Sequence, residues 1–249
     1  MIFGLTLQRW RCIRGFLSLL AAVLWTGPAF ALGGSAISGT NWGLSSHVVM
    51  VLGSRGSVCT GTLISQRVIV TAAHCTAGSS QIAVAYIEDG RPILQAVSEV
   101  ARNPGFSRKT AVSLDIALLR LQSDLPNRFV PVPIDGGAAA SEVGEDLTIA
   151  GFGLSEERDL KSAGTLRAAS VRLLPKIYPR FLRLGIDARL DSLAVCKGDS
   201  GGPVMSGGTL LGVLYAAERT GKAKSCGARA QAVRLAPQRA WISSVLARW

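Results

Sequence analysis

Short runs of β-branched and other apolar residues recur along the chain after residue 47. They span residues 48–52, 61–64, 68–70, 82–86 and 93–100. Gly, Ser, Asn and Asp residues break the pattern between the runs, as turns do between the strands of an antiparallel sheet. We therefore predict that this region consists of short β-strands.

A second set of similar runs follows Asn127 and Arg128. Its members are residues 147–153, 165–174, 202–205, 209–215 and 230–235. Frequent short strands without long amphipathic helices between them are typical of antiparallel barrels or sandwiches. The hydrophobic pattern thus predicts an all-β fold with two parts of similar make-up.

The C-terminal tail, residues 237–249, changes from a strand period to a helical one. The apolar side chains that repeat at this period are Trp241, Ile242, Val245, Leu246 and Trp249. Pro237 suits the first turn of a helix, because its fixed φ angle is already close to the helical value. We predict a C-terminal helix over residues 237–249, packed on the second β unit.

Residues 1–31 have the pattern of an export signal. Arg9, Arg11 and Arg14 precede an apolar run at residues 16–25, and Ala29-Phe30-Ala31 forms a small-residue cleavage site. The apolar run is too short to span a bilayer comfortably. We predict a signal peptide over residues 1–31, and a periplasmic or extracellular protein that keeps no membrane anchor once the signal is removed.

The composition is that of a globular protein: 48% of the 249 residues are hydrophobic and 17% are charged. A chain of this length can bury a substantial core. The formal net charge is +11, of which the leader contributes three arginines, so about +8 remains after its removal (11 − 3). The basic residues are scattered and aromatic residues make up only 6%, so we expect a solvated surface and no nucleic-acid partner.

One stretch, residues 195–204, carries the signature of a nucleophile. Its centre reads Gly198-Asp199-Ser200-Gly201-Gly202. A hydroxyl between small residues can sit on a tight loop whose backbone N–H groups converge on one point. The string also fits the nucleophile elbow of α/β-hydrolases, but those enzymes place their histidine after the serine. Here the only histidines, His47 and His74, both precede Ser200.

Two further motifs precede this serine in the order His, Asp, Ser. They are Thr71-Ala72-Ala73-His74-Cys75 and Asp115-Ile116-Ala117-Leu118-Leu119. Together with the serine loop they resemble the trypsin/chymotrypsin family of serine endopeptidases, from roughly Ile37 to Trp249. The resemblance implies two antiparallel six-stranded β-barrels with the active site in the cleft between them. The implied boundaries are 32–36 for a short pro-segment, 37–135 for the first barrel, 136–236 for the second and 237–249 for the helix.

The resemblance also implies roles for individual residues. Ser200 would be the nucleophile, His74 the general base and Asp115 the group that fixes the base's tautomer. The N–H groups of Gly198 and Ser200 would form the oxyanion hole. His47 matches none of the motifs, so we expect it to be structural. The substrates would be proteins or peptides, and the alternative is a catalytically silent, protease-like binding protein.

Export makes the cysteine count informative, because disulfides persist outside the reducing cytosol. Four cysteines remain if Cys12 leaves with the signal, and four cysteines allow three connectivities. The resemblance implies the pairs Cys59–Cys75 and Cys196–Cys226, each contributing on the order of 3 kcal/mol to stability. Two histidines and four paired cysteines leave too few ligands for a metal site, so we expect no metal and no cofactor.

The segment Ile37-Ser38-Gly39-Thr40 resembles the Ile-Val-Gly-Gly that begins mature members of the family. The resemblance implies that the freed amine of Ile37 pairs with Asp199, and a buried carboxylate needs such a partner. No Arg or Lys directly precedes Ile37, unlike in trypsin-activated zymogens. Signal peptidase would cut either after Ala31, with five residues left to trim, or directly after Ala36.

By the same resemblance, Ala194 would form the floor of the primary specificity pocket, with Ala217 and Ala230 as its walls. Methyl groups alone would leave a Lys or Arg side chain desolvated and unpaired, so we expect a preference for small or medium apolar residues. Asp191 is the alternative floor residue, which would favour basic side chains instead. Tyr215 stands where the family often has a serine that supports the catalytic acid.

Overall fold

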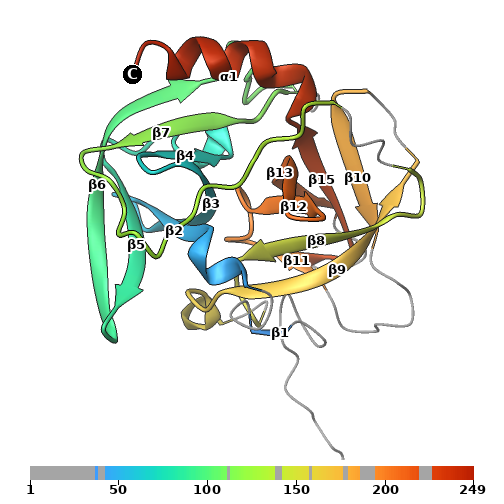
Figure 1. Cartoon of the computed structure of the whole chain (residues 1–249). Coiled ribbons are helices and arrows are strands. Elements are labelled where there is room, and N and C mark those ends of the chain that lie inside the picture. Colours follow the sequence, from blue (N-terminus) through green and yellow to red (C-terminus); the bar gives the residue numbers. More distant parts are fainter. Residues whose placement is uncertain are drawn as a thin grey trace, which may run out of the picture.

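The computed structural model describes residues 37–38, 43–110, 113–137, 142–156, 159–175, 179–185, 194–218 and 226–249. Two β-barrels lie side by side, and the C-terminal helix runs across one end of the pair (Figure 1). The predicted all-β fold is therefore confirmed. The predicted signal peptide and Asp191 lie outside the described residues.

The first barrel is closed and has six strands in the order β2-β3-β4-β7-β6-β5, each antiparallel to its neighbours. The strands are β2 (Val48–Gly53), β3 (Ser57–Ser65), β4 (Val68–Thr71), β5 (Ile82–Glu88), β6 (Arg91–Arg102) and β7 (Ala117–Leu121). Alternate residues of these strands point inward. Val49, Leu63, Ile69, Leu119 and Phe129 are among the buried residues that fill the interior.

The second barrel also has six strands, in the order β9-β10-β15-β13-β12-β8, and a further β8–β9 pairing closes the ring. Its strands are β8 (Asp146–Gly151), β9 (Arg167–Leu174), β10 (Phe181–Gly185), β12 (Pro203–Ser206), β13 (Thr209–Glu218) and β15 (Arg229–Arg234). A separate two-stranded pair joins β11 (Val195–Cys196) to β14 (Cys226–Gly227). The interior of the second barrel is filled by Ile149, Leu173, Leu182, Leu214 and their buried neighbours.

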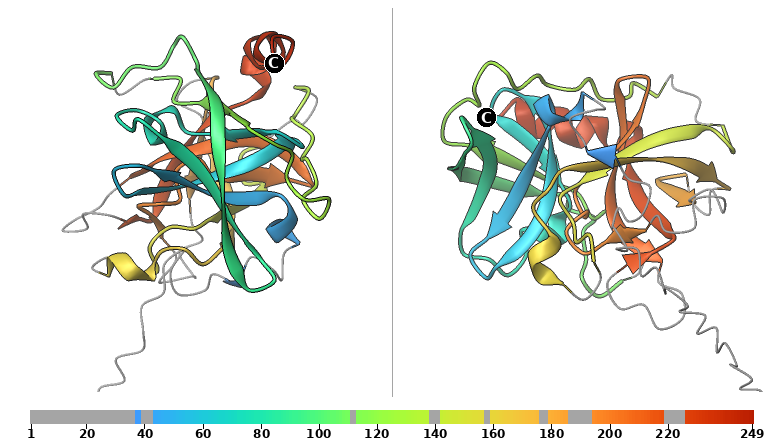
Figure 2. Two further views of the ribbon diagram at one scale, coloured as in Figure 1. Left: turned by 90° about the vertical axis from the view of Figure 1, so that its left-hand side faces the viewer. Right: turned by 90° about the horizontal axis from the view of Figure 1, so that it is seen from below.

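The two barrels share part of their cores. Val70 and Leu118 of the first barrel belong to the same buried cluster as Ala150, Val213 and Val233 of the second. Seen from below, the strands of the two barrels meet along this common boundary (Figure 2). Because buried side chains of both units interlock there, the strands that carry the functional loops hold fixed positions relative to one another.

Strand β1 (Ile37–Ser38) departs from the predicted domain boundary. We predicted that residues 37–135 form the first barrel, but β1 pairs with β9 of the second, with Ile37 opposite Ala168. On this edge of β9, β10 pairs only with residues 172–174. Since β10 does not pair with Arg167 or Ala168, the backbone groups on this edge are available to β1.

Two further elements differ from the prediction. The hydrophobic pattern did not single out β10, which pairs with β9 and β15. The helix α1 spans only Arg239–Leu246, because Pro237 lies in a preceding 3-10 turn, η5 (Ala236–Gln238). The described residues also contain the 3-10 turns η2 (Leu44–Ser46), η3 (Ala73–Cys75) and η4 (Leu160–Ser162). None of the helices in the described ranges is long and apolar enough to cross a membrane.

Candidate active site

His74 and Asp115 meet because the strands next to them are neighbours. His74 lies in η3, just after β4, and Asp115 lies just before β7. Thr71 at the end of β4 pairs with Ala117 at the start of β7, so both flanking segments emerge at the same end of the first barrel. His74 and Asp115 are therefore in direct contact, although they are 41 positions apart in the sequence.

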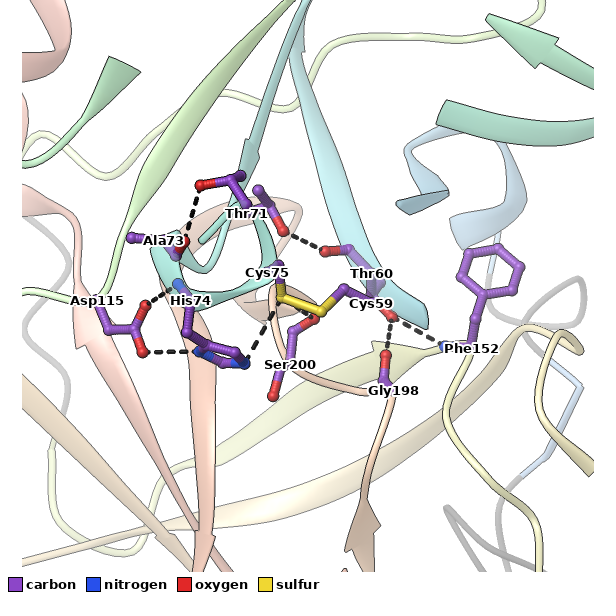
Figure 3. The surroundings of a disulfide bond; sticks show 11 residues. Cys59, Thr60, Thr71, Ala73, His74, Cys75, Asp115, Phe152, Gly198 and Ser200 are labelled. Atoms are coloured by element: carbon purple, nitrogen blue, oxygen red, sulfur yellow. Dashed lines mark hydrogen bonds and ion pairs between the residues drawn. A yellow bond between two sulfur atoms is a disulfide. The ribbon is translucent and has the colours of Figure 1, made fainter. Parts of the chain in front are cut away.

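Asp115 holds His74 through both carboxylate oxygens. The backbone N–H of His74 donates to Oδ1 at 2.8 Å, and the ring Nδ1 lies 2.7 Å from Oδ2 (Figure 3). The acid is almost fully buried, with 7% of its surface exposed. A carboxylate beside Nδ1 favours the tautomer that carries its proton there, which leaves the Nε2 lone pair free to accept a proton.

The disulfide Cys59–Cys75 ties this segment to β3. Cys75 Sγ lies 3.7 Å from His74 Nε2 and 3.8 Å from the carbonyl oxygen of Ser200. Figure 3 shows His74, Ser200 and Gly198 gathered around this bond. Cys59, His74 and Cys75 are grouped closely enough to hold a metal ion, but the disulfide engages both sulfurs, so neither is available as a thiolate ligand.

The second barrel supplies Ser200. No hydrogen bond between Ser200 Oγ and His74 Nε2 is found within the part of the chain that the structure describes. Such bonds are often long or poorly aligned in proteases without substrate and tighten in the substrate complex.

The orientation of the Gly198 N–H follows from its peptide plane. The carbonyl of Lys197 accepts a hydrogen bond from Leu154 N at 3.0 Å. In a planar trans peptide the N–H points opposite to the C=O. The N–H of Gly198 is therefore directed away from Leu154.

The same argument applies to Ser200. The carbonyl of Asp199 accepts from Gly202 N at 3.0 Å, which turns the N–H of Ser200 away from Gly202. Among the backbone bonds of the described residues, neither Gly198 N nor Ser200 N donates to any group. These two N–H groups are the pair that could bind a developing oxyanion.

Two glycines make this loop possible. Gly198 has φ of 105°, and a Cβ there would lie 2.7 Å from Gly153 Cα. Gly201 has φ of 88°, and a Cβ there would lie only 2.0 Å from the carbonyl oxygen of Thr60. Side chains are excluded at both positions because the backbone is left-handed and packed against other backbone atoms.

Asp199 is buried behind the serine, with 1% of its surface exposed. Its Oδ1 accepts from Gly153 N at 2.9 Å and its Oδ2 from Cys196 N at 2.8 Å. Burial raises the pKa of Asp199 to about 7, and the two N–H donors and the Arg167 guanidinium oppose that rise. The buried carboxylate thus has hydrogen-bond donors but lacks a directly bonded cation among the described residues.

Ile37, the predicted partner of Asp199, lies in β1. Its neighbour Ser38 pairs with Arg167 of β9, and Arg167 pairs on its other side with Gly151 of β8, against which the Asp199 carboxylate packs. One strand therefore separates β1 from Gly151. The pairing of the Ile37 amine with Asp199 stays a prediction.

The second disulfide, Cys196–Cys226, joins β11 to β14. The predicted wall residues of the pocket lie on β13 and β15. Ala217 and Ala230 face each other directly in the β13–β15 register. Ala194 packs against the cluster that contains the disulfide. The structure therefore brings the two proposed wall residues together and sets the proposed floor residue beside the bond that anchors the serine loop.

Tyr215 stands where the family often has a serine that supports the catalytic acid. Its side chain takes part in a chain of hydrogen bonds with other polar residues. Its hydroxyl bonds with Gln231, whose amide donates to Glu218 at 3.1 Å, and Glu218 in turn pairs with Arg183. The pKa of Tyr215 is raised to about 12, mainly by burial and also by the negative charge of Asp115. The negative charge of Glu218 adds to this rise, and the hydroxyl itself bonds with Gln231.

His47 lies away from the His74–Asp115 pair in the sequence, and its ring contacts the backbone. Its Nδ1 lies 2.6 Å from the carbonyl oxygen of Val130, which precedes the link to the second barrel. Sequence reasoning missed two residues that act on the serine loop. They are Thr60, which bonds with Gly198 and Ser200, and Arg167, whose positive charge lowers the pKa of Asp199. No motif marks either residue, because each acts through partners distant in the sequence.

The site combines a His–Asp pair from one barrel with a serine loop from another, next to two free N–H donors. These features define a class of hydrolases in which a serine attacks a carbonyl group. The family model described as Trypsin matches residues 32–242. The chain therefore belongs to the trypsin family of serine proteases.

Individual relatives agree with this assignment. The chain is 28% identical to human kallikrein-7 over 211 residues, covering 79% of this chain and 82% of the relative. It is 29% identical to trypsin delta of Drosophila erecta over 200 residues, covering 74% and 78%. The solved structure of neuropsin, a serine protease of mouse brain, has a similar fold, with a TM-score of 0.67 and 22% identity, covering 81% of this chain and 95% of that one.

Proposed function

We propose that this protein is an exported serine endopeptidase that hydrolyses peptide bonds through an acyl-enzyme on Ser200. The observation that carries the proposal is the pairing of an oriented base, His74, with two free N–H donors at Gly198 and Ser200. A binding protein derived from the same fold would need neither. All three predicted triad residues are present in the chain.

In the proposed reaction, the Oγ of Ser200 attacks the scissile carbonyl carbon while its proton passes to Nε2 of His74. The negative charge on the carbonyl oxygen is stabilised by the N–H groups of Gly198 and Ser200. The C–N bond then breaks, and His74 gives its proton to the departing amine. A water molecule, deprotonated by His74, hydrolyses the acyl-enzyme and regenerates Ser200.

For specificity, we propose a shallow apolar pocket built by Ala194, Ala217 and Ala230. The direct pairing of Ala217 with Ala230 supports it, since neither methyl group can neutralise a basic side chain. Small or medium apolar residues on the acyl side of the cut bond are expected to dominate a peptide-library profile. A preference for Arg or Lys would contradict this pocket and favour Asp191.

We also propose that export frees the amine of Ile37 to pair with Asp199. The raised pKa of the buried Asp199 carboxylate supports the need for a cation there. Because β1 pairs with β9, this step requires residues 37–38 to leave that edge. N-terminal sequencing of the exported, active protein is the test, and a fully active form beginning at Leu32 would contradict it.

A fluorophosphonate probe tests the central proposal. The intact exported protein is expected to be labelled covalently at Ser200, and Ser200→Ala should abolish labelling without changing the fold. The control is Ser206→Ala, on the neighbouring strand β12, which should label normally. Absence of labelling in the folded wild type would instead support the catalytically silent alternative.

A further inference from the structure

Thr60 lies in β3 of the first barrel and has no exposed surface. It nevertheless makes four hydrogen bonds, and three of them reach segments of the second barrel. Its Oγ1 donates to the carbonyl of Gly198 at 2.9 Å and accepts from Phe152 N at 3.0 Å. Its N–H donates to the carbonyl of Ser200 at 2.8 Å, and its own carbonyl accepts from Thr71 Oγ1 at 2.7 Å. Figure 3 shows the bonds of Thr60 with Thr71, Gly198 and Phe152 beside the disulfide.

The Thr60 hydroxyl acts on the peptide unit that links the two oxyanion donors. In the peptide between Gly198 and Asp199, the Gly198 carbonyl accepts a hydrogen bond from Thr60 Oγ1. The N–H of Asp199 donates to the carbonyl of Cys196 at 3.1 Å. This plane lies between the N–H of Gly198 and the N–H of Ser200. Because peptide planes are rigid, its orientation sets the angle between the two donors.

The next peptide is held from the same residue. The carbonyl of Ser200 accepts from Thr60 N, and Gly201 N donates to the carbonyl of Leu214 at 2.7 Å. The close approach of Gly201 to the Thr60 carbonyl leaves no space for a side chain. Thr60 thus contacts the loop on both sides of the nucleophile.

We propose that the Thr60 hydroxyl is a positioning residue for the oxyanion hole, supplied by one barrel to the catalytic loop of the other. This inference rests on the proposed function, because it assigns a purpose to the Gly198 and Ser200 donors. Preorganised donors stabilise the transition state without reorganisation during the reaction. Loss of the hydroxyl leaves the buried Gly198 carbonyl without its partner and releases the plane between the donors.

The chain offers a matched control on the same strand. Thr62 is also fully buried in β3, but its Oγ1 has no hydrogen-bond partner within the described part of the chain. Thr60→Val and Thr62→Val make the same chemical change, replacement of a hydroxyl by a methyl group. Thr60→Ser keeps the hydroxyl and removes only the methyl group.

The experiment measures kcat and KM on a peptide ester or amide that the wild type cleaves, together with the rate of fluorophosphonate labelling. Thr60→Val is expected to lower kcat and the labelling rate by about tenfold to a hundredfold. This decrease is no larger than the decrease in kcat expected when one oxyanion-hole donor is removed. KM should change by less than about threefold, because the hydroxyl does not contact the substrate. Thr60→Ser should recover most of kcat, and Thr62→Val should leave both constants unchanged.

Circular dichroism and thermal unfolding establish that each variant is folded. If Thr60→Val does not fold, Thr60→Ala and Thr60→Ser give the same comparison of absent and present hydroxyl. The inference is overturned if loss of the hydroxyl leaves kcat unchanged, if it changes only KM, or if Thr60→Ser is as slow as the variants without a hydroxyl. A wild type that does not react with the probe would instead refute the proposed function itself.

Discussion

At the scale of single residues, Asp199 has the most perturbed environment near the site. Desolvation opposes its ionisation, whereas the N–H groups of Gly153 and Cys196 and the charge of Arg167 favour it. Burial in turn lowers the pKa of the Arg167 guanidinium, and Asp199 raises it. Burial and these favourable contacts thus act in opposite directions on the ionisation of Asp199.

This environment predicts how stability depends on pH. A carboxyl whose pKa is about 7 in the folded protein and about 4 in the unfolded chain holds its proton more tightly when folded. The free energy of unfolding should therefore fall as pH rises from about 4 to about 7, and Asp199→Asn should remove that contribution. The variant is expected to gain up to about 4 kcal/mol relative to the parent over this range.

Denaturant unfolding at a series of pH values measures this difference. Both proteins carry Ser200→Ala, which prevents self-cleavage, and both retain the residues before Ile37. The control is Asp146→Asn, whose carboxylate is exposed and paired with Arg172. A stability difference between parent and Asp199→Asn that does not vary with pH would contradict the prediction.

At the scale of elements, the pairing of β4 with β7 decides the geometry of the base. The strand register aligns Thr71 with Ala117, which brings the loop that bears Asp115 to the backbone and the ring of His74. Neither residue would meet the other if the strands shifted by one position. The orientation of the base is thus a property of two adjacent strands.

Replacing Asp115 by Asn tests this arrangement. An amide can still accept from the His74 backbone N–H, but it no longer favours the ring tautomer with the proton on Nδ1. We expect kcat to fall by more than about a hundredfold with little change in the free energy of unfolding. Asp124→Asn, at an exposed ion pair with Arg67, is the control. A kcat within a few-fold of the wild type would show that Asp115 does not orient the base.

At the scale of the whole molecule, the shared core joins the two barrels into one unit. The buried cluster that includes Leu118 and Val213 contains residues of both. The hydrogen bonds from Thr60 to Gly198 and Ser200 cross the same boundary. The serine loop and the His–Asp pair therefore keep their relative positions only while this boundary is intact.

Leu118→Ala creates a cavity at the boundary and should lower the free energy of unfolding by about 2–5 kcal/mol. Because the core is common, the protein should still unfold in one transition rather than barrel by barrel. Denaturant unfolding followed by both tryptophan fluorescence and circular dichroism measures this. Leu246→Ala, at a side chain that is 37% exposed, should have a much smaller effect. Two separate transitions would indicate that the barrels are independent.

Local patterns in the sequence determined most of the strands and the family of this protein. Short runs of β-branched and other apolar residues, separated by turn residues, predicted most strands of both barrels, because such residues favour strands that bury their side chains. Short motifs identified His74, Asp115 and Ser200, and family resemblance gave the two disulfides that the structure contains. The catalytic roles of these residues, the pocket and the Ile37 pairing stay predictions.

Only the tertiary structure decided which distant groups meet. The pairing of β1 with the second barrel, the place of β10 between β9 and β15, and the contact of Thr60 with Gly198 depend on partners far away in the chain. Thr60 and Thr62 are the same residue type on the same strand, yet only the first has bonding partners for its hydroxyl among the described residues. A hydrogen bond needs a partner at a defined distance and angle, and that partner is brought into place only when the two barrels pack together.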